Sequence, residues 1–355
     1  MIDQIFIEGS ASLSPSDVTG KVRNGGGLFK GAMIILGLAC GASIGREGPT
    51  VHIAAAINYS LARVGRFPHY VQSRGLIMAG AAAGLSAAFN TPLAGIVFAI
   101  EELSRKFEGE VNGVVFIAVI IAGMTALALQ GNYNYFNVEA TQLTTMDAAV
   151  AVLVCGLVGG LLGGVFSGLL IRGGAYFNPL RMAHPYLLAA VCGLLLASIG
   201  LLSGGLTYGT GYEEANPALM AGEGSGVFFP LLKLAATVIS YLSGIPGGIF
   251  SPSLSIGANL GAELAPLLPS TPGAALALLG MVAYFSGVVR APLTAVVIVM
   301  EMTNEQHNML LPLLATALLA QWVSRHVCPR PLYHTLANAF LQKPESRGSS
   351  CEIKR

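Results

Sequence analysis

Apolar stretches follow one another along almost the entire chain, and this pattern restricts the possible folds more than any other feature of the sequence. Several stretches reach the roughly 20 residues that a transmembrane helix needs, while others are shorter and interrupted by glycine or proline. Interrupted segments are tolerated at membrane depth only where protein or a water-filled cavity surrounds them. We therefore expect an all-α, polytopic integral membrane protein with helices of unequal length. The stretches are Leu28–Ile44, Gly75–Ile100, Gly113–Leu129, Ala148–Ile171, Pro185–Leu202, Val227–Ile239, Pro272–Met300 and Met309–Val323.

Charged residues are too scarce for the alternative fold class, a large soluble helical protein. They make up 10% of the 355 residues, against about 25% in a typical soluble domain, and 54% of the residues are hydrophobic. The net charge of +1 gives no basic footprint for binding nucleic acid. The five cysteines are scattered without a CxxC pair, which argues against a metal site and a disulfide framework, and no cofactor is expected.

The two chain ends differ in charge, and this difference predicts an orientation. Residues 1–20 lack the charged-then-apolar pattern of a signal peptide. Lys and Arg are frequent between Arg325 and Arg355, so the positive-inside rule places the C-terminus in the cytoplasm. Arg105 and Lys106 follow an apolar stretch and indicate a second cytoplasmic end.

Two segments of the chain form an internal repeat. Gly80–Glu102 aligns over Gly280–Met302 without a gap, at an offset of 200 residues. A glycine-proline break precedes each copy, GREGPT at 45–50 and GGIFSPS at 247–253. The alternative is chance similarity between helices rich in alanine and glycine. The identical pairs are Gly80/Gly280, Ala83/Ala283, Ser86/Ser286, Pro92/Pro292, Leu93/Leu293, Val97/Val297 and Glu101/Glu301.

Both breaks open into helical stretches, and this arrangement is typical of an anion site. The first amides of a helix have no partner within the helix, and the helix dipole makes that end positive. Glycine lets these N–H groups approach an ion closely, and proline fits the first turn. In transporters built from repeats, such helix ends lie near the membrane midplane and point at an anion. The alternative is a pair of ordinary loops with helix caps.

The motifs resemble those of the CLC family of chloride channels and chloride/proton antiporters. GREGPT is similar to the family's GREGP signature, and GGIFSP to its GxFxP signature. FNTPLAGIVFAIEE and RAPLTAVVIVMEMT resemble the segments that follow each signature, and PLYHTL at 331–336 resembles the tyrosine segment near the end of the membrane domain. The resemblance runs from about Leu28 to Gln342. It implies a helical inverted-repeat fold with broken helices, and a homodimer in a lipid bilayer whose subunits each hold an ion pathway.

The resemblance places Glu47 on the family's gating glutamate. Its carboxylate would occupy the outer anion site in place of chloride and leave when protonated. An ionisable residue inside a membrane is costly and is a functional hypothesis by default. The alternative is a carboxylate at a helix N-terminus that the dipole favours without a role in transport. Arg46 would keep the site positive or form a structural salt bridge.

The other site residues follow from the same resemblance. Gly45 and Gly48 would complete the anion-binding signature around Arg46. Ile249 and Phe250 would offer backbone N–H groups to a central anion, and Tyr333 would donate its phenolic O–H to the same ion. A tyrosine there could otherwise be an interfacial anchor.

Two acidic positions at the end of the first repeat copy are expected to differ in role. Glu102 matches the intracellular proton-transfer glutamate of family antiporters, and its alternative is a solvated charge at a helix end. Glu101 and Glu301 occupy equivalent repeat positions, so we expect a structural role for both.

The chain departs from the family pattern at its N-terminus. The family's GSGIP signature, whose serine completes the central anion site, is not found before KGAMIILG. We therefore expect the first few helices of the family fold to be missing. A single membrane domain over residues 1–355 is predicted, with a truncated half at 28–140, a second half at 148–336 and a cytoplasmic tail at 337–355. Regulatory CBS domains are not expected, which favours a protein of the bacterial inner membrane.

The resemblance implies transmembrane chloride transport coupled to protons, with chloride and the proton as the transported species. A passive voltage-gated-type chloride channel is the first alternative, and Glu102 argues against it. A fluoride exporter fits the GREGP form and Tyr333 less well. A non-transporting fragment is a further alternative because of the missing N-terminal signature. No enzyme activity is expected, because none of the histidines forms a protease motif with Ser167, Ser243 or Ser286.

Overall fold

The computed structural model describes residues 26–64, 73–103, 113–131, 135–136, 138, 145–303, 307–333 and 335–336. Within these ranges all regular secondary structure is helical, apart from one antiparallel bridge between Gly45 and Gly248, which confirms the all-α prediction. The helices before residue 140 are α3 (Gly26–Ala39), α4 (Glu47–Val64), α5 (Ser73–Phe89), α6 (Pro92–Phe98), the π-helical turn η1 (Ala99–Leu103) and α7 (Gly113–Gln130). Those after it are α8 (Thr145–Ala183), α9 (Pro185–Leu202), α10 (Tyr212–Met220), α11 (Phe229–Leu242), α12 (Phe250–Ala262), η3 (Ala265–Leu267), α13 (Gly273–Val289), α14 (Pro292–Thr303), η4 (His307–Met309) and α15 (Leu310–Val327).

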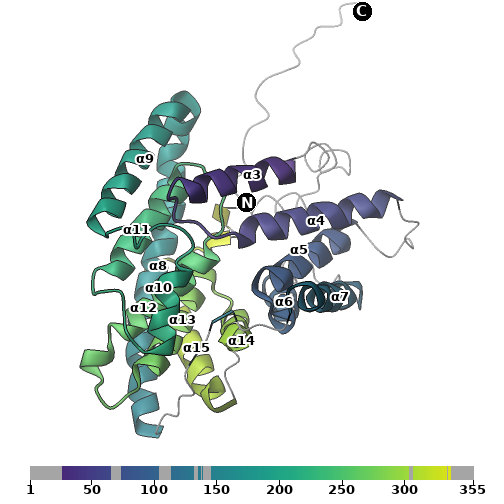
Figure 1. Ribbon diagram of the computed structural model, residues 1–355. Helices are drawn as coiled ribbons and strands as arrows, with labels where there is room; N and C mark the ends of the chain where they lie inside the picture. The colour runs from purple at the N-terminus through teal and green to yellow at the C-terminus, as the bar shows by residue number, and fades with distance from the viewer. Residues whose placement is uncertain are drawn as a thin grey trace, which may run out of the picture.

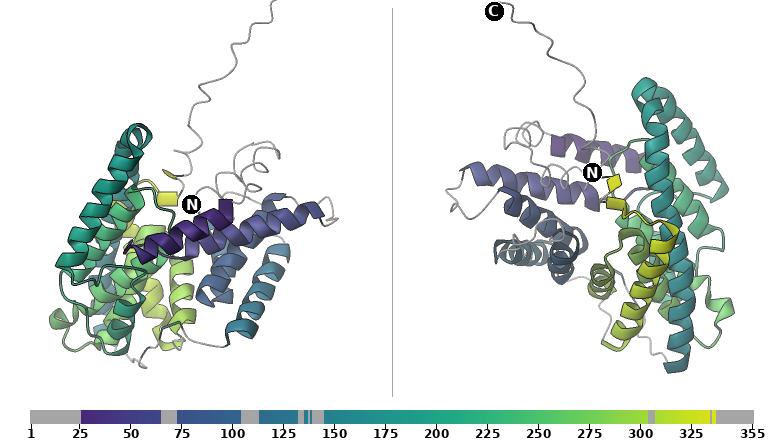
Figure 2. Two further views of the ribbon diagram at one scale, coloured as in Figure 1. Left: turned by 45° about the horizontal axis from the view of Figure 1, so that its top comes forward. Right: turned by 180° about the vertical axis from the view of Figure 1, so that it is seen from behind.

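The helices form two groups that meet along the middle of the molecule. Helices α4 to α7 lie together on one side, and α8 to α13 lie on the other (Figure 1). In the second group, α13 packs against α12, α8 and α15. Helices α6 and α14 contact each other and connect the groups. The views in Figure 2 show α8 and α9 side by side along the outer edge of the second group. The predicted tail at 337–355 lies outside the described residues.

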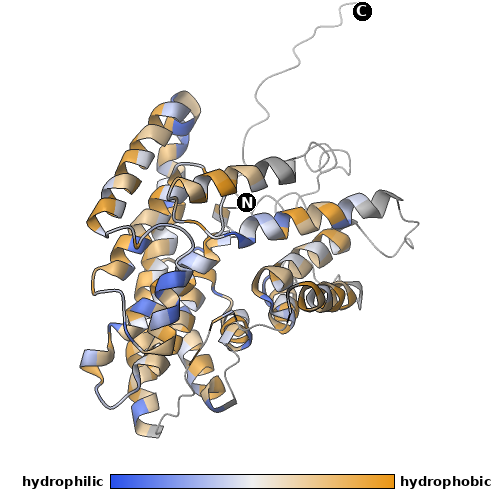
Figure 3. Ribbon diagram, in the orientation of Figure 1, coloured by the Kyte–Doolittle hydropathy of each residue, from blue (hydrophilic) through white to orange (hydrophobic). Residues whose placement is uncertain are grey.

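Most of the helices consist largely of apolar residues (Figure 3). Two described helical segments are long and hydrophobic enough to cross a membrane by length and composition alone, Met146–Ala183 and Pro185–Leu202, and shorter apolar helices accompany them. Large apolar side chains point outward on helices of both groups, including Met124 on α7 and Leu194 on α9, which are 66% and 71% exposed. Exposed apolar surface on this scale suits contact with lipid or with another subunit.

The internal repeat is confirmed by matching backbone breaks. Helices α5 and α6 occupy 73–89 and 92–98, and α13 and α14 begin at the equivalent positions 273 and 292. Asn90 and Arg290, which separate the two helices of each copy, both adopt left-handed backbone conformations with φ of 57° and 63°. Each apolar stretch predicted as one segment, Gly75–Ile100 and Pro272–Met300, is therefore two helices. The residue before a proline avoids helical geometry, and a proline follows each break by two residues.

Glycine permits close packing at equivalent positions of the two copies. A Cβ atom on Gly80 would lie 2.7 Å from the carbonyl oxygen of Ala54 on α4, and one on Gly280 would lie 2.5 Å from the carbonyl oxygen of Gly257 on α12. Small residues allow helix backbones to approach in this way, which is the usual packing mode inside membranes. The helices that follow the two signatures, α4 and α12, are thus held directly against the repeat helices α5 and α13.

Glu101 and Glu301 form a reciprocal pair of caps between α6 and α14. The Glu301 carboxylate accepts hydrogen bonds from the backbone N–H groups of Leu93 at 3.0 Å and Ala94 at 2.7 Å, in the first turn of α6. The Glu101 carboxylate accepts from Leu293 N at 3.2 Å and Thr294 N at 2.7 Å, in the first turn of α14. Each acid satisfies amides that have no partner within their own helix. These contacts support the structural role expected for both glutamates.

Removal of one cap should destabilise the protein. In Glu301→Gln the amide oxygen can accept one of the two hydrogen bonds, while its NH₂ group faces an amide donor. A hydrogen bond to a charged group contributes about 1.5–3 kcal/mol, so we expect a clear fall in the unfolding temperature in detergent. The control is Glu213→Gln, because Glu213 is exposed and an exposed substitution usually changes stability by less than about 0.5 kcal/mol. Equal unfolding temperatures for the two variants would contradict the capping role.

Candidate anion site

The two glycine-proline breaks lie against each other, although about 200 residues separate them in the chain. Gly45 N donates to Gly248 O at 2.7 Å, and Gly248 N donates to Gly45 O at 2.8 Å. Helix α4 begins at Glu47, and α12 begins at Phe250. The N-terminal ends of two helices therefore meet at the center of the fold, and both contribute positive potential there.

The Glu47 side chain lies at this meeting point. The residue is 1% exposed, and its Oε1 accepts a hydrogen bond from the backbone N–H of Ser251, in the first turn of α12. Its Oε2 has no hydrogen-bond partner among the described residues. The carboxylate is thus held by the end of a helix that it does not belong to, in the manner of an anion bound at a helix N-terminus.

Glycines provide the space in which the carboxylate sits. A Cβ atom on Gly248 would lie 2.5 Å from Glu47 Oε2, and one on Gly45 would overlap the same carboxylate. A Cβ atom on Gly48 would lie 3.4 Å from the Gly248 backbone. Gly45 therefore leaves room that a side chain would fill, whereas a Cβ atom on Gly48 would make only an ordinary van der Waals contact.

Phe250 and Tyr333 lie next to each other beside this carboxylate site. Phe250 is 1% exposed, and its ring centroid is 6.2 Å from that of Tyr333 and 4.9 Å from that of Phe285. Tyr333 is 5% exposed, so it is a core residue and not an interfacial anchor. Ile249 is the N-cap of α12 and directly precedes Phe250. The residues predicted to bind the central anion are thus brought together.

Glu102 lies on a different part of the fold. It belongs to η1, the π-helical turn that continues α6, and it is half-buried. Single π-helical turns inside α-helices are frequent at functional sites. Its neighbour Glu101 is fixed on the first turn of α14, so the position of Glu102 in the backbone is also fixed.

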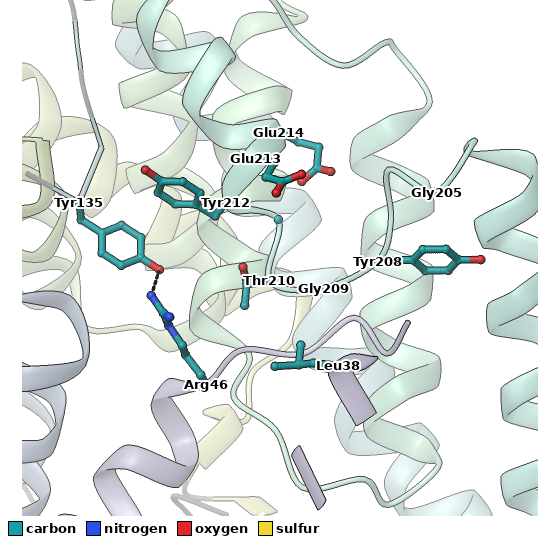
Figure 4. Close-up of a pocket in the computed structure, with 11 residues that line it drawn as sticks. Leu38, Arg46, Tyr135, Gly205, Tyr208, Gly209, Thr210, Tyr212, Glu213 and Glu214 are labelled. Carbon is teal, nitrogen blue, oxygen red and sulfur yellow. Dashed lines mark hydrogen bonds between the residues drawn. The ribbon is translucent and has the colours of Figure 1, made fainter. Parts of the chain in front are cut away.

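Arg46 lines a cavity of about 600 Å³ (Figure 4). Its Nη2 donates to the Tyr135 hydroxyl oxygen at 3.4 Å, and its guanidinium carbon lies 5.9 Å from the centre of the Tyr135 ring. The Arg46 side chain thus lies at the cavity and not on the Ser251 amide that holds Glu47. The lining residues are Leu38, Arg46, Tyr135, Gly205, Tyr208, Gly209, Thr210, Gly211, Tyr212, Glu213 and Glu214.

The sequence interpretation missed two residues of this region. Tyr135 packs edge-on against Phe89 and Tyr212, at 5.8 Å and 5.3 Å between ring centroids, and nothing in the local pattern marks it. Lys233 on α11 is fully buried and donates to the carbonyl oxygens of residues 207, 208 and 209 at 2.9–3.1 Å, and the last two of these residues line the cavity. A single charge inside the apolar stretch Val227–Ile239 could have identified Lys233.

Comparisons with known proteins agree with this geometry. The family described as voltage gated chloride channel matches residues 17–325. An H(+)/Cl(−) exchange transporter, ClcA, from Klebsiella pneumoniae subsp. pneumoniae is 32% identical over 333 residues, which cover 90% of this chain and 69% of that protein. A slow cyanobacterial Cl⁻/H⁺ antiporter of known structure is 27% identical with a TM-score of 0.82, and the match covers 96% of this chain and 81% of that one.

A second solved structure broadens the range of anions among the relatives. A CLC-type fluoride/proton antiporter is 27% identical with a TM-score of 0.76, over 94% of this chain and 81% of that one. The family match extends over most of the chain and includes both paired loops, Glu47, Glu102 and Phe250. The chain belongs to the voltage gated chloride channel family, a family of integral membrane transport proteins.

Proposed function

We propose that the chain carries out proton-coupled chloride exchange across a bacterial plasma membrane. The observation that carries this proposal is the Glu47 carboxylate, which is buried where two helix N-termini meet and bound to the first turn of α12. The printed functions of the ClcA relative and of the cyanobacterial antiporter support it. Chloride and the proton are the transported species, and no cofactor or enzymatic step is part of the proposal.

The geometry supports a simple exchange of one anion for another. The ionised Glu47 carboxylate accepts hydrogen bonds from backbone N–H groups to which chloride would otherwise bind. A proton that binds the carboxylate removes its charge, and the amide at Ser251 then favours chloride over the neutral acid. Loss of the proton restores the carboxylate, which competes with chloride again. In this scheme Phe250 N–H, Ile249 N–H and the Tyr333 hydroxyl hold the central anion, while Gly45 leaves room for the Glu47 carboxylate or the chloride that replaces it.

In this scheme Arg46 acts on the anion and Glu102 acts on the proton. Arg46 lies at the cavity and attracts anions toward the gate, where Tyr135 holds its guanidinium. Glu102 receives protons at the end of α6 without contact with the anion. The C-terminal side of the protein then faces the cytoplasm, and two copies form a homodimer through their exposed apolar faces.

Two measurements on purified protein in liposomes separate the alternatives. An imposed chloride gradient should drive proton movement against the membrane potential, while a passive channel would carry chloride without protons. Replacement of chloride by fluoride should reduce the flux, and a higher flux with fluoride would assign the chain to fluoride export. No anion flux in monodisperse protein would support the non-transporting fragment.

Glu102→Gln should uncouple protons from chloride. Glutamine has nearly the same shape as glutamate but cannot carry a proton, so chloride flux should persist while proton pumping stops. The measurement is parallel recording of chloride and pH in the same liposome suspension. Glu213→Gln is the control, because it neutralises an exposed acid at the cavity and should leave proton pumping in place. A parallel fall of both fluxes in Glu102→Gln would show that Glu102 is structural.

A further inference from the structure

Arg290 occupies a backbone position for which arginine is a poor choice. Its φ of 63° is left-handed, a conformation that costs free energy for a bulky residue. The equivalent position of the first repeat copy holds Asn90, and asparagine tolerates this conformation better than most residues. Arginine is also costly inside a membrane protein, and Arg290 is only 6% exposed. The turn itself does not require arginine, so the reason that arginine is present should lie in the contacts of the guanidinium group.

The Arg290 guanidinium joins the end of α13 to the end of α15. Its Nη2 donates to Ser324 O at 3.2 Å, and its Nη1 donates to Pro329 O at 3.1 Å. Ser324 O also accepts the backbone N–H of Cys328, which closes the last turn of α15. A cation on the last carbonyl groups of a helix is favoured by the helix dipole. In the reverse direction, Gln321 Nε2 donates to Arg290 O at 2.9 Å.

The hydrogen bond from Arg290 Nη1 to Pro329 O holds the chain just before Tyr333. Only three residues separate Pro329 from Tyr333, and one of them is Pro331, whose ring fixes its own φ. Thr335 N donates to Pro331 O at 3.0 Å, so the segment enters a helical turn at once. A short, stiff link of this kind transmits a shift at Pro329 to the Tyr333 ring, which packs on Phe250.

We propose that Arg290 is a positioning residue for Tyr333: by holding the Pro329 carbonyl group, it fixes the hydroxyl that binds the central anion. This inference rests on the proposed function, in which Tyr333 donates to chloride. A binding group must be held to within about 0.5 Å to act at full strength, and the support of its neighbours provides this precision.

The test is a double-mutant cycle in the full chain. Arg290→Asn copies the residue of the first repeat, keeps the left-handed turn and removes the guanidinium. A hydrogen bond to a charged group corresponds to about 10- to 100-fold in affinity, so we expect chloride binding by calorimetry to weaken about tenfold, with fewer protons moved per chloride. In a Tyr333→Ala background the same substitution should change neither quantity further, because the group that Arg290 positions is already gone.

Two further variants keep the test decisive. Arg290→Lys keeps the charge but not the two-pronged donor, so its chloride affinity should lie between those of the wild type and Arg290→Asn. It replaces Arg290→Asn in the cycle if that variant does not yield monodisperse protein. Ser286→Ala removes another hydrogen bond from α13 to α15, from Ser286 Oγ to Ala317 O, and should leave affinity and coupling unchanged.

The outcomes separate the two proposals. Equal losses from the Arg290 variants in both Tyr333 backgrounds, or a Ser286→Ala loss as large as theirs, would overturn the positioning role. A wild-type chain that binds chloride but moves no protons would refute the proposed exchange, and the affinity cycle would still decide the role of Arg290.

Discussion

Glu47→Gln should transport chloride without protons and without a response to pH. Glutamine resembles the protonated acid, so it cannot compete with chloride for the amides at the start of α12. The carboxylate that it replaces is fully buried and bound to Ser251 N. A charged group in that position is an anion that a proton can remove, and the variant lacks this switch. We expect proton movement to fall to the level of protein-free liposomes while chloride flux continues.

The measurement compares chloride and proton flux in wild-type and variant liposomes across the acid and neutral range. The wild-type chloride flux should rise as the pH falls, because protonation displaces the carboxylate. The variant should give a constant flux over the same range. Proton-linked transport that survives in Glu47→Gln would exclude Glu47 as the gate and would move attention to other acids near the cavity, including Glu214.

Gly280→Val should prevent the formation of a stable protein. The first side-chain atom would already lie 2.5 Å from Gly257 O, 2.6 Å from Gly261 Cα and 2.7 Å from Gly261 N. All three are backbone atoms of α12, so relief requires movement of the helix that carries the anion site. Overpacking of a tight core typically costs about 1–3 kcal/mol, and occasionally more, against the roughly 5–15 kcal/mol that stabilises a folded protein; the clash with three backbone atoms places Gly280→Val at the upper end. We expect aggregation on size-exclusion chromatography in detergent.

A matched glycine makes this test specific for packing. Gly193 lies inside α9, and a Cβ atom there would have nothing within 4 Å. Gly193→Val makes the same chemical change in a helix and should give a monodisperse protein with a near-normal unfolding temperature. A stable Gly280→Val protein with unchanged chloride flux would show that α12 and α13 can separate without cost, contrary to the packing described above.

Local sequence signals predicted the parts of the fold that local chemistry determines. Glycine and proline mark both breaks, and helix ends follow from them at Glu47 and Phe250. The offset of the repeat predicted equivalent roles for Glu101 and Glu301. It did not predict their partners, because a cap between two helices depends on how the halves pack. Hydropathy also failed to divide the stretches at Asn90 and Arg290, because a single left-handed residue hardly changes a hydropathy pattern.

The site was predicted in part for the same reason. Glu47, Phe250 and Tyr333 lie in recognisable motifs, and the structure places the two aromatic rings in contact. Tyr135 is held by rings from helices that are distant in the chain, Phe89 and Tyr212, so its place at the site follows from packing and not from a local motif. The clamp from Arg290 to Pro329 joins residues 39 positions apart through side-chain geometry that no pattern of residue types encodes. Interactions of this kind depend on the tertiary fold.

The reciprocal caps also set an order of events during synthesis. The backbone N–H groups of Leu93 and Ala94 cannot form their hydrogen bonds until Glu301, about 208 residues further along the chain, has been synthesised. At about 5–20 residues per second, the ribosome needs roughly 10–40 s to make that stretch. Throughout this interval the start of α6 has exposed donors in an apolar environment, and the insertion machinery or nearby water must satisfy them. The first half can therefore reach its final hydrogen bonding only after most of the second half has left the ribosome, so a stall in translation between the two copies leaves an incompletely folded membrane intermediate.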